Sequence, residues 1–279
     1  MKLLFAGSEC APFFKTGGLG DVMGALPKTI AKTTDNDVRV VLPFFTGMAE
    51  EYKSQLSFVT SFYVKVGWRD QYCGVLKLEM DNVTYYFIDN LYYFDRPGLY
   101  GYYDEGERWA FFQQAIIEML EKIGFIPDIL HVNDYHTAFI PFLLKEKYGW
   151  INAYQNIKTV LTIHNLQFQG EYGREVLGEL FNLDASYYDD GTVRFDTAVN
   201  FMKTGILYAD KVNTVSPTYA SEIQTEAFGQ GLDEILRMHN WKLRGILNGI
   251  DYERNNQKIY LLIPNIFHEG LESVCHLSW

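Results

Sequence analysis

Short apolar runs alternate with helix-patterned segments along most of the chain, and this alternation constrains the fold more than any other feature of the sequence. Repeated strand–helix–strand units of this size indicate a parallel sheet with helices on both faces. We therefore predict an α/β fold, a Rossmann-like parallel sheet with flanking helices. The strands are expected at 2–7, 38–44, 128–134, 159–165 and 211–217, and the helices at 18–33, 108–124, 137–149, 201–210 and 217–228.

One region departs from this alternation. Between residues 57 and 90, three apolar runs rich in Val, Tyr and Phe follow one another with no helical pattern between them. The segment "MDN" separates two of these runs and is typical of a turn. We predict a small antiparallel meander here.

The carboxyl ends of the expected strands are the place to look for a functional site. In parallel α/β sheets, ligands bind outside these ends of the strands. Glycines and polar residues stand at the ends of four of these strands, at 7–9, 133–134, 164–165 and 216–217, and at 248–249 in the strand-and-turn segment "LRGILNGIDYE". We expect these segments to lie along one edge of the sheet.

A cluster of glycines follows the first strand, in the segment "FFKTGGLGDV" at residues 13–22. It is not a P-loop, because Lys15 precedes the glycines, and it is not the GxGxxG fingerprint, because Met23 stands where the last glycine should be. Its position between a strand and a helix leaves two interpretations open. The helix N-terminus could bind an anion, or the glycines could only fit a tight turn.

The segments "HVNDYHT" and "TIHN" hold the histidines that follow strands. His131 and His136 are five residues apart and do not share a helix face, so a metal site is weakly supported. Asp134 could act in a ligand site, or it could cap the helix that begins near His136. His164 could likewise be a catalytic residue or a hydrogen-bonded structural one.

The composition excludes several classes of function. The net charge of −11 disfavours nucleic-acid binding, which needs an excess of Lys and Arg. Three cysteines without a CxxC pair indicate neither a disulfide framework nor a zinc site. The chain shows no signal-peptide pattern and no run long enough to span a bilayer, so we expect a cytoplasmic protein with no membrane partner.

Considered together, the motifs resemble one family. In chain order they are "SECAPFFKTGGLGDV", "DRPGLYG", "HVNDYHT", "TIHNLQFQG", "FMKTGILYAD", "VNTVSPTYA" and "LNGID". This set resembles bacterial glycogen synthase, also called starch synthase, from Met1 to about Tyr252. The family transfers glucose from ADP-glucose to the non-reducing end of an α-1,4-glucan with retention. It has the GT-B fold, in which two Rossmann-like halves enclose the reaction cleft.

The resemblance implies roles for the residues that follow the first strand. Lys15 is expected to contact the donor phosphates, and Gly17 and Gly18 are expected to let the backbone approach the donor. Asp21 is expected to fix the loop or to touch a sugar hydroxyl. The resemblance thus implies that the glycine cluster binds the diphosphate of the donor nucleotide.

The resemblance also places residues around the transferred sugar. His164 is expected at the anomeric side of the glucose as the catalytic residue, with Asn165 beside it. Asp134 is expected near the glucan acceptor, and Asn248 near the bound sugar. The motifs offer no carboxylate nucleophile, which suits a mechanism in which the donor phosphate assists deprotonation of the acceptor. ADP-glucose and an α-1,4-glucan such as glycogen are the implied partners, with no metal and no cofactor.

The end of the chain departs from the family pattern. The family continues after "LNGID" with a second Rossmann-like half that clamps the diphosphate, whereas residues 253–279 do not resemble that half. We expect residues 1–252 to form the N-terminal domain and 253–279 to be an atypical tail from a truncation or frameshift. The chain is then expected to be inactive alone. The alternatives are a non-catalytic module that binds glucan or nucleotide, and another GT-B enzyme such as a sucrose synthase or a phosphorylase.

Overall fold

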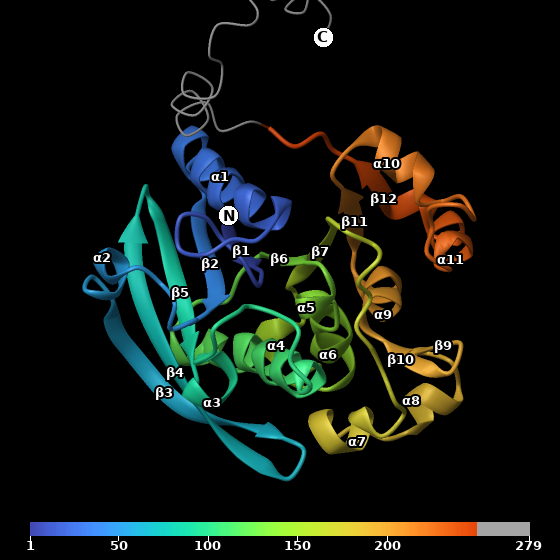
Figure 1. Ribbon diagram of the computed structural model, residues 1–279, viewed down its shortest axis with the longest axis horizontal. Helices are drawn as coiled ribbons and strands as arrows, with labels where there is room; N and C mark the ends of the chain where they lie inside the picture. The colour runs from blue at the N-terminus through green and yellow to red at the C-terminus, as the bar shows by residue number, and fades with distance from the viewer. Residues whose placement is uncertain (250–279) are drawn as a thin grey trace, which may run out of the picture. The chain divides into compact units, whose positions relative to one another are not determined.

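A nine-stranded sheet carries the rest of the fold in the computed structural model, which describes residues 1–249 (Figure 1). The strand order is β12-β11-β7-β6-β1-β2-β5-β4-β3. All neighbouring strands from β12 to β5 are parallel, which confirms the predicted α/β fold with its parallel sheet. The bounds are β1 (Lys2–Ala6), β2 (Asp37–Pro43), β3 (Ser57–Val66), β4 (Arg69–Met80), β5 (Val83–Asp89), β6 (Ile129–Asn133), β7 (Lys158–Ile163), β11 (Lys211–Thr214) and β12 (Leu243–Gly245).

The predicted antiparallel meander is confirmed as β3, β4 and β5, and it continues the main sheet. β5 pairs parallel to β2 on one side and antiparallel to β4 on the other, so the meander forms one end of the nine strands. A second, three-stranded antiparallel sheet was not expected from the sequence. It consists of β8 (Glu171–Tyr172), β10 (Ala198–Asn200) and β9 (Arg194–Phe195), which are too short to show a period of two.

The helices follow the predicted pattern, with differences at their ends. α1 (Gly18–Thr33) matches its predicted bounds, and α4 (Glu105–Lys122) begins three residues before its prediction. The segment expected as one helix at 137–149 contains two, α5 (Tyr135–Ala138) and α6 (Ile140–Glu146). The others are α2 (Glu50–Lys53), α3 (Leu91–Phe94), α7 (Val176–Phe181), α8 (Ser186–Asp189), α9 (Phe201–Tyr208), α10 (Pro217–Glu222) and α11 (Asp233–Met238), with 3-10 turns η1 (Asn152–Tyr154) and η2 (Asn240–Lys242).

Both faces of the main sheet are covered, which explains why its central strands read as continuous apolar runs. Along β1, Leu4 and Ala6 pack into the core that contains α4, whereas Leu3 and Phe5 pack into the core that contains α1. Figure 1 shows α1 on one face of the sheet and α4 on the other. Trp109 of α4 is fully buried in the first core. The two cores hold β1 rigidly, so the loop that follows it has a fixed origin.

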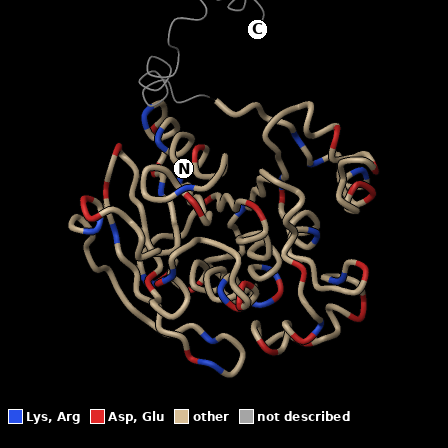
Figure 2. The backbone as a smooth tube through the Cα atoms, viewed as in Figure 1, with Lys and Arg blue, Asp and Glu red and all other residues tan. Residues whose placement is uncertain are grey.

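Charge is dispersed over the described residues. Figure 2 shows Lys and Arg interspersed with Asp and Glu along residues 1–249. No helix in this range is both long and apolar enough to cross a bilayer. The expected tail at 253–279, and the last three residues of the expected domain at 1–252, lie outside the described residues.

Candidate functional site

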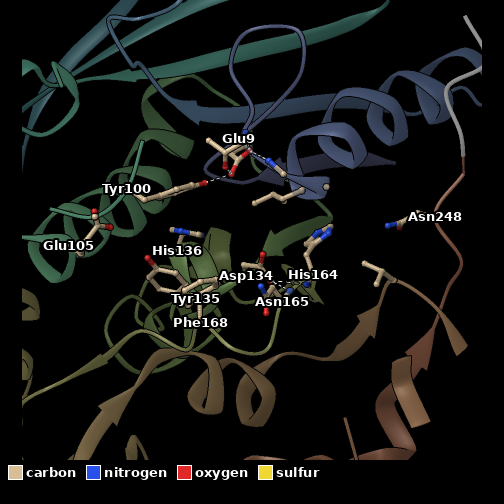
Figure 3. Close-up of a pocket in the computed structure, with 16 residues that line it drawn as sticks. Glu9, Tyr100, Glu105, Asp134, Tyr135, His136, His164, Asn165, Phe168 and Asn248 are labelled. Atoms are coloured by element: carbon tan, nitrogen blue, oxygen red, sulfur yellow. Dashed lines mark hydrogen bonds between the residues drawn. The ribbon is translucent and has the colours of Figure 1, made fainter. Parts of the chain in front are cut away.

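A cavity of about 810 Å³ opens at the carboxyl ends of the central strands (Figure 3). Its walls come from the connections after β1, β6, β7, β11 and β12 and from the segment that leads into α4. The lining residues are Glu9, Thr16, Gly17, Gly18, Leu19, Tyr100, Gly101, Glu105, Asp134, Tyr135, His136, His164, Asn165, Phe168, Val215 and Asn248. Polar residues after β1, β6, β7 and β12 thus meet at one edge of the sheet.

Six of the eight residues expected in the site line this cavity. They are Gly17, Gly18, Asp134, His164, Asn165 and Asn248. The other two, Lys15 and Asp21, form an ion pair of 2.5 Å beside the glycine loop, with side chains 40% and 54% exposed. Lys15 therefore stands at the rim with its charge paired to Asp21.

The glycines of the loop fall into two groups. A Cβ on Gly20 would lie 2.5 Å from Lys15 Cβ, and one on Gly24 would lie 2.5 Å from the Ala11 carbonyl oxygen, so these two allow close packing. A Cβ on Gly17 or Gly18 would meet nothing within 4 Å. Gly17 is the N-cap of α1, and no side chain caps it. Gly20 and Gly24 thus serve close packing inside α1 rather than a tight turn, while Gly17 and Gly18 border open space at a helix N-terminus.

Glu9 was not among the expected site residues, yet its carboxylate organises the loop. Oε2 accepts the backbone N–H groups of Thr16 at 2.5 Å and Gly17 at 3.2 Å. Oε1 accepts the hydroxyls of Thr16 at 2.7 Å and Tyr100 at 2.6 Å. The signal in the sequence was its place at the end of the first strand, within 7–9.

Asp134 lies at the N-cap position of α5, but its side chain makes no capping hydrogen bond. The capping interpretation is therefore wrong. Its Oδ1 instead accepts the backbone N–H groups of His164 at 2.8 Å and Asn165 at 3.3 Å, which joins the ends of β6 and β7. Burial raises the pKa of this carboxyl to about 7, although the two backbone N–H groups act in the opposite direction.

His164 is held in one orientation by Asn133. Asn133 Nδ2 donates to the Ala6 carbonyl oxygen at 3.0 Å, so its Oδ1 faces His164 Nε2 at 2.9 Å. Burial lowers the pKa of His164 to about 4, so the ring is neutral near pH 7. Nε2–H then donates to Asn133, and Nδ1 is left as an acceptor.

His131 and His136 lie in different surroundings. His131 Nε2 pairs with Thr162 Oγ1 at 2.5 Å inside the sheet, and His131 does not line the cavity. Within residues 1–249, no three His, Cys, Asp or Glu side chains are grouped as metal ligands would be.

The rings of Tyr100, Tyr135, His136 and Phe168 line one side of the cavity, here called the aromatic arm. Sequence reasoning did not identify them. The His136 ring lies 3.9 Å from the Tyr135 ring and 5.0 Å from the Tyr100 ring, measured between centroids. In Figure 3, Tyr100, His136, Tyr135 and Phe168 lie on the side away from Asn248. Such rings suit a sugar, whose C–H faces pack on aromatic surfaces.

A fully buried arginine fixes the segment that carries Tyr100. Arg108 Nε donates to the Tyr93 carbonyl oxygen at 3.0 Å, and Nη2 donates to the Leu99 carbonyl oxygen at 3.2 Å. Its Nη1 donates to Glu105 Oε1 at 2.7 Å. The aromatic arm is therefore built on a braced segment.

Comparison with known proteins identifies the family. Residues 2–238 match the model of the starch synthase catalytic domain. The chain belongs to this family. The chain is 61% identical over 258 residues to the glycogen synthase of Lactobacillus acidophilus, covering 92% of this chain and 54% of that protein. It is 59% identical over 271 residues to the glycogen synthase of Lactococcus lactis, covering 96% of this chain and 57% of that protein.

A solved structure shows the same fold. The catalytic domain of Starch Synthase IV from Arabidopsis thaliana, bound to ADP and acarbose, matches with a TM-score of 0.83 at 30% identity. The match covers 90% of this chain and 52% of that one. The family and the GT-B type of fold expected from the sequence are confirmed. The chain spans about half the length of the relatives it matches.

Proposed function

We propose that this chain supplies one half of a glycogen synthase that transfers glucose from ADP-glucose to the non-reducing end of an α-1,4-glucan with retention. The observation that carries the proposal is the cavity at the strand ends of a starch synthase catalytic domain. The names of the relatives, and the ADP and acarbose in the similar Arabidopsis structure, support a nucleotide sugar and a glucan as substrates.

The donor phosphates belong at the glycine loop in this proposal. The backbone of Gly17 and Gly18 borders open space at the N-terminus of the 16-residue α1, where N–H groups and the helix dipole favour an anion. Lys15 stands next to them and can exchange its ion pair with Asp21 for a phosphate contact. Until the donor binds, Asp21 holds Lys15 beside the glycine loop.

The transferred glucose belongs beside His164 and Asn165, and Asp134 lies near the glucan acceptor. His164 is neutral and fixed in orientation, so it presents a dipole to the charge that develops at the anomeric carbon. Asn248, whose backbone N–H donates to the Val215 carbonyl oxygen at 3.3 Å, contributes from the end of the sheet. The acceptor glucan then occupies the aromatic arm.

None of the three carboxylates that line the cavity, Glu9, Glu105 and Asp134, is suited to act as a free nucleophile. Glu105 Oε1 accepts from Arg108 Nη1 at 2.7 Å. Glu9 accepts four hydrogen bonds, and Asp134 holds two backbone N–H groups. A retaining transfer through a glycosyl–enzyme intermediate needs a carboxylate that can reach the anomeric carbon. This suits a mechanism in which the departing diphosphate is the base that takes the proton of the acceptor hydroxyl.

The test is glucose transfer by a joined enzyme, in which residues 1–248 precede the second half of the Lactobacillus acidophilus relative. Radiolabelled ADP-glucose and UDP-glucose are each supplied with glycogen, and incorporation into glucan is measured. The proposal predicts transfer from ADP-glucose by the joined enzyme and none by the chain alone. Glucan binding by a folded joined enzyme without transfer from either donor would favour a binding module instead.

A further inference from the structure

A chain of hydrogen bonds crosses the cavity wall from His136 to the glycine loop. His136 Nδ1 lies 3.2 Å from Ser8 Oγ, and Ser8 Oγ lies 2.8 Å from the Tyr100 hydroxyl. The Tyr100 hydroxyl lies 2.6 Å from Glu9 Oε1. The chain thus connects residues after β1 and β6 with the segment before α4.

Chemistry allows only one direction along this chain. The Glu9 carboxylate accepts two backbone N–H groups and two hydroxyls, so it acts as an acceptor throughout. Tyr100 therefore donates its proton to Glu9 and must accept from Ser8. Ser8 has then used its proton on Tyr100 and must accept from His136 Nδ1. The direction places the imidazole proton on Nδ1.

The other ring nitrogen of His136 is left for a ligand. Burial, with the nearby charge of Arg108, lowers the pKa of His136 to about 3, so the neutral ring carries one proton near pH 7. Within residues 1–249, His136 Nε2 makes no hydrogen bond. Among the fully buried side-chain nitrogen and oxygen atoms of these residues, only Gln113 Nε2 lacks a partner, so His136 Nε2 is not one of them. His136 lines the cavity, so its ring can be contacted from there.

We propose that Glu9 and Tyr100 are positioning residues that fix His136 as its Nδ1–H tautomer, so that Nε2 accepts a hydrogen bond from a sugar hydroxyl in the aromatic arm. The sugar as ligand rests on the proposed function, whereas the tautomer does not. Glu9 also holds Thr16 and Gly17, so one carboxylate sets the geometry of both ends of the cavity. A site that expects a hydroxyl rejects an analogue without it, because the acceptor then stays unpaired.

The first experiment reads the tautomer in the chain itself. Histidine labelled with 15N is incorporated, and the two ring nitrogens of His136 are identified by two-bond correlations and by loss of the signals in His136→Gln. We expect a protonated Nδ1 and a bare Nε2. A protonated Nε2 in the unmodified chain overturns the proposal.

The second experiment breaks the chain of hydrogen bonds. Tyr100→Phe removes the acceptor for Ser8, so the Ser8 hydroxyl is free to donate to His136 Nδ1 and the ring shifts toward Nε2–H. Ser8→Ala cuts the next link and is expected to give a mixture of tautomers, which preserves the test if one variant fails to fold. Tyr148→Phe is the matched control, because the Tyr148 hydroxyl donates to Glu118 Oε1 at 2.7 Å outside the cavity. Unchanged tautomers in both Tyr100→Phe and Ser8→Ala contradict the relay.

The third experiment adds maltotriose and follows the same nitrogens. We expect the His136 Nε2 signal to shift on titration, and binding to weaken about fivefold in Tyr100→Phe with no change in Tyr148→Phe. A confirmed tautomer with no response of His136 to maltotriose overturns the sugar contact and leaves the relay standing. A response of His164 alone places the sugar at the donor end. It likewise overturns the sugar contact of His136 and leaves the relay standing.

Discussion

The backbone N–H of His164 donates to Asp134 Oδ1 at 2.8 Å, which ties the end of β7 to the end of β6. The carboxyl that makes this contact is itself buried, and burial raises its pKa to about 7. Asp134 thus positions the loop that carries His164 while its own negative charge is poorly solvated. Because the pKa of this buried carboxyl is raised on folding, the stability of the fold depends on pH.

Asp134→Asn is expected to gain stability relative to the unmodified chain as pH rises from 5 to 8. The folded pKa lies above the ordinary value of 3.8, so the folded state keeps a proton that the unfolded state loses between about pH 4 and 7. The stability from Asp134 is therefore lost as pH rises through 7, by at most about 4 kcal/mol. Asn keeps an acceptor oxygen and does not titrate.

Urea unfolding of both proteins at pH 5 and pH 8 measures this difference. The histidines whose pKa is lowered in the folded state, His131, His136 and His164, take up protons on unfolding near pH 5 in both proteins. The difference between variant and parent is therefore the useful quantity. The exposed Asp35→Asn is the control. If the free-energy difference between Asp134→Asn and the parent is the same at both pH values, the carboxyl is not perturbed as described.

Lys15→Ala in the joined enzyme is expected to lower kcat/KM for ADP-glucose about 10²- to 10³-fold. A charged contact that is strongest in the transition state contributes about 2.7–4 kcal/mol. Lys65→Ala is the control, because Lys65 forms a comparable exposed ion pair of 2.9 Å with Asp70 between β3 and β4. Near-normal kcat/KM in Lys15→Ala would show that the lysine serves only its pair with Asp21.

His164→Ala in the joined enzyme is expected to lower kcat by a larger factor than it raises the KM for the donor. A group beside the anomeric carbon acts mainly on charge that develops during transfer. Steady-state kinetics with varied ADP-glucose gives both constants. His239→Ala is compared, because His239 lies after α11 and outside the cavity lining. An unchanged kcat would make His164 a structural residue.

Gly24→Ala is expected to destabilise the chain by about 1–3 kcal/mol, although alanine favours helices. The added Cβ would lie 2.5 Å from the Ala11 carbonyl oxygen, and a backbone atom cannot move aside cheaply. Gly178→Ala in α7 is the matched control, since its Cβ would meet nothing within 4 Å. It is expected to stabilise the chain by about 0.5–1 kcal/mol in thermal unfolding. Equal effects of the two substitutions would contradict the packing argument.

The sheet and much of the cavity could be predicted from the sequence, because both follow from the order of apolar and polar segments along the chain. Apolar runs mark the buried strands, and the carboxyl ends of parallel strands share one edge, so Asp134 and His164 could be expected together. The single helix expected at 137–149 is two, because its apolar pattern continues across the break at Phe139.

Glu9 and Tyr100 could not be paired from the sequence. They are 91 residues apart, and their contact depends on how Arg108 holds the segment before α4. The wrong capping interpretation of Asp134 has the same origin. An acid before a helix predicts a cap, whereas here the backbone of a neighbouring strand end offers better-placed donors.

The cavity is lined by separate connections of one sheet whose strands are anchored in two cores. Because each connection begins and ends in a buried element, a change in one can leave the others in place. On the proposed function, donor preference can then be altered at the glycine loop and acceptor preference in the aromatic arm by separate substitutions, except at Glu9, which contacts both. The same framework can therefore be adapted to new glycosyl donors or acceptors one connection at a time.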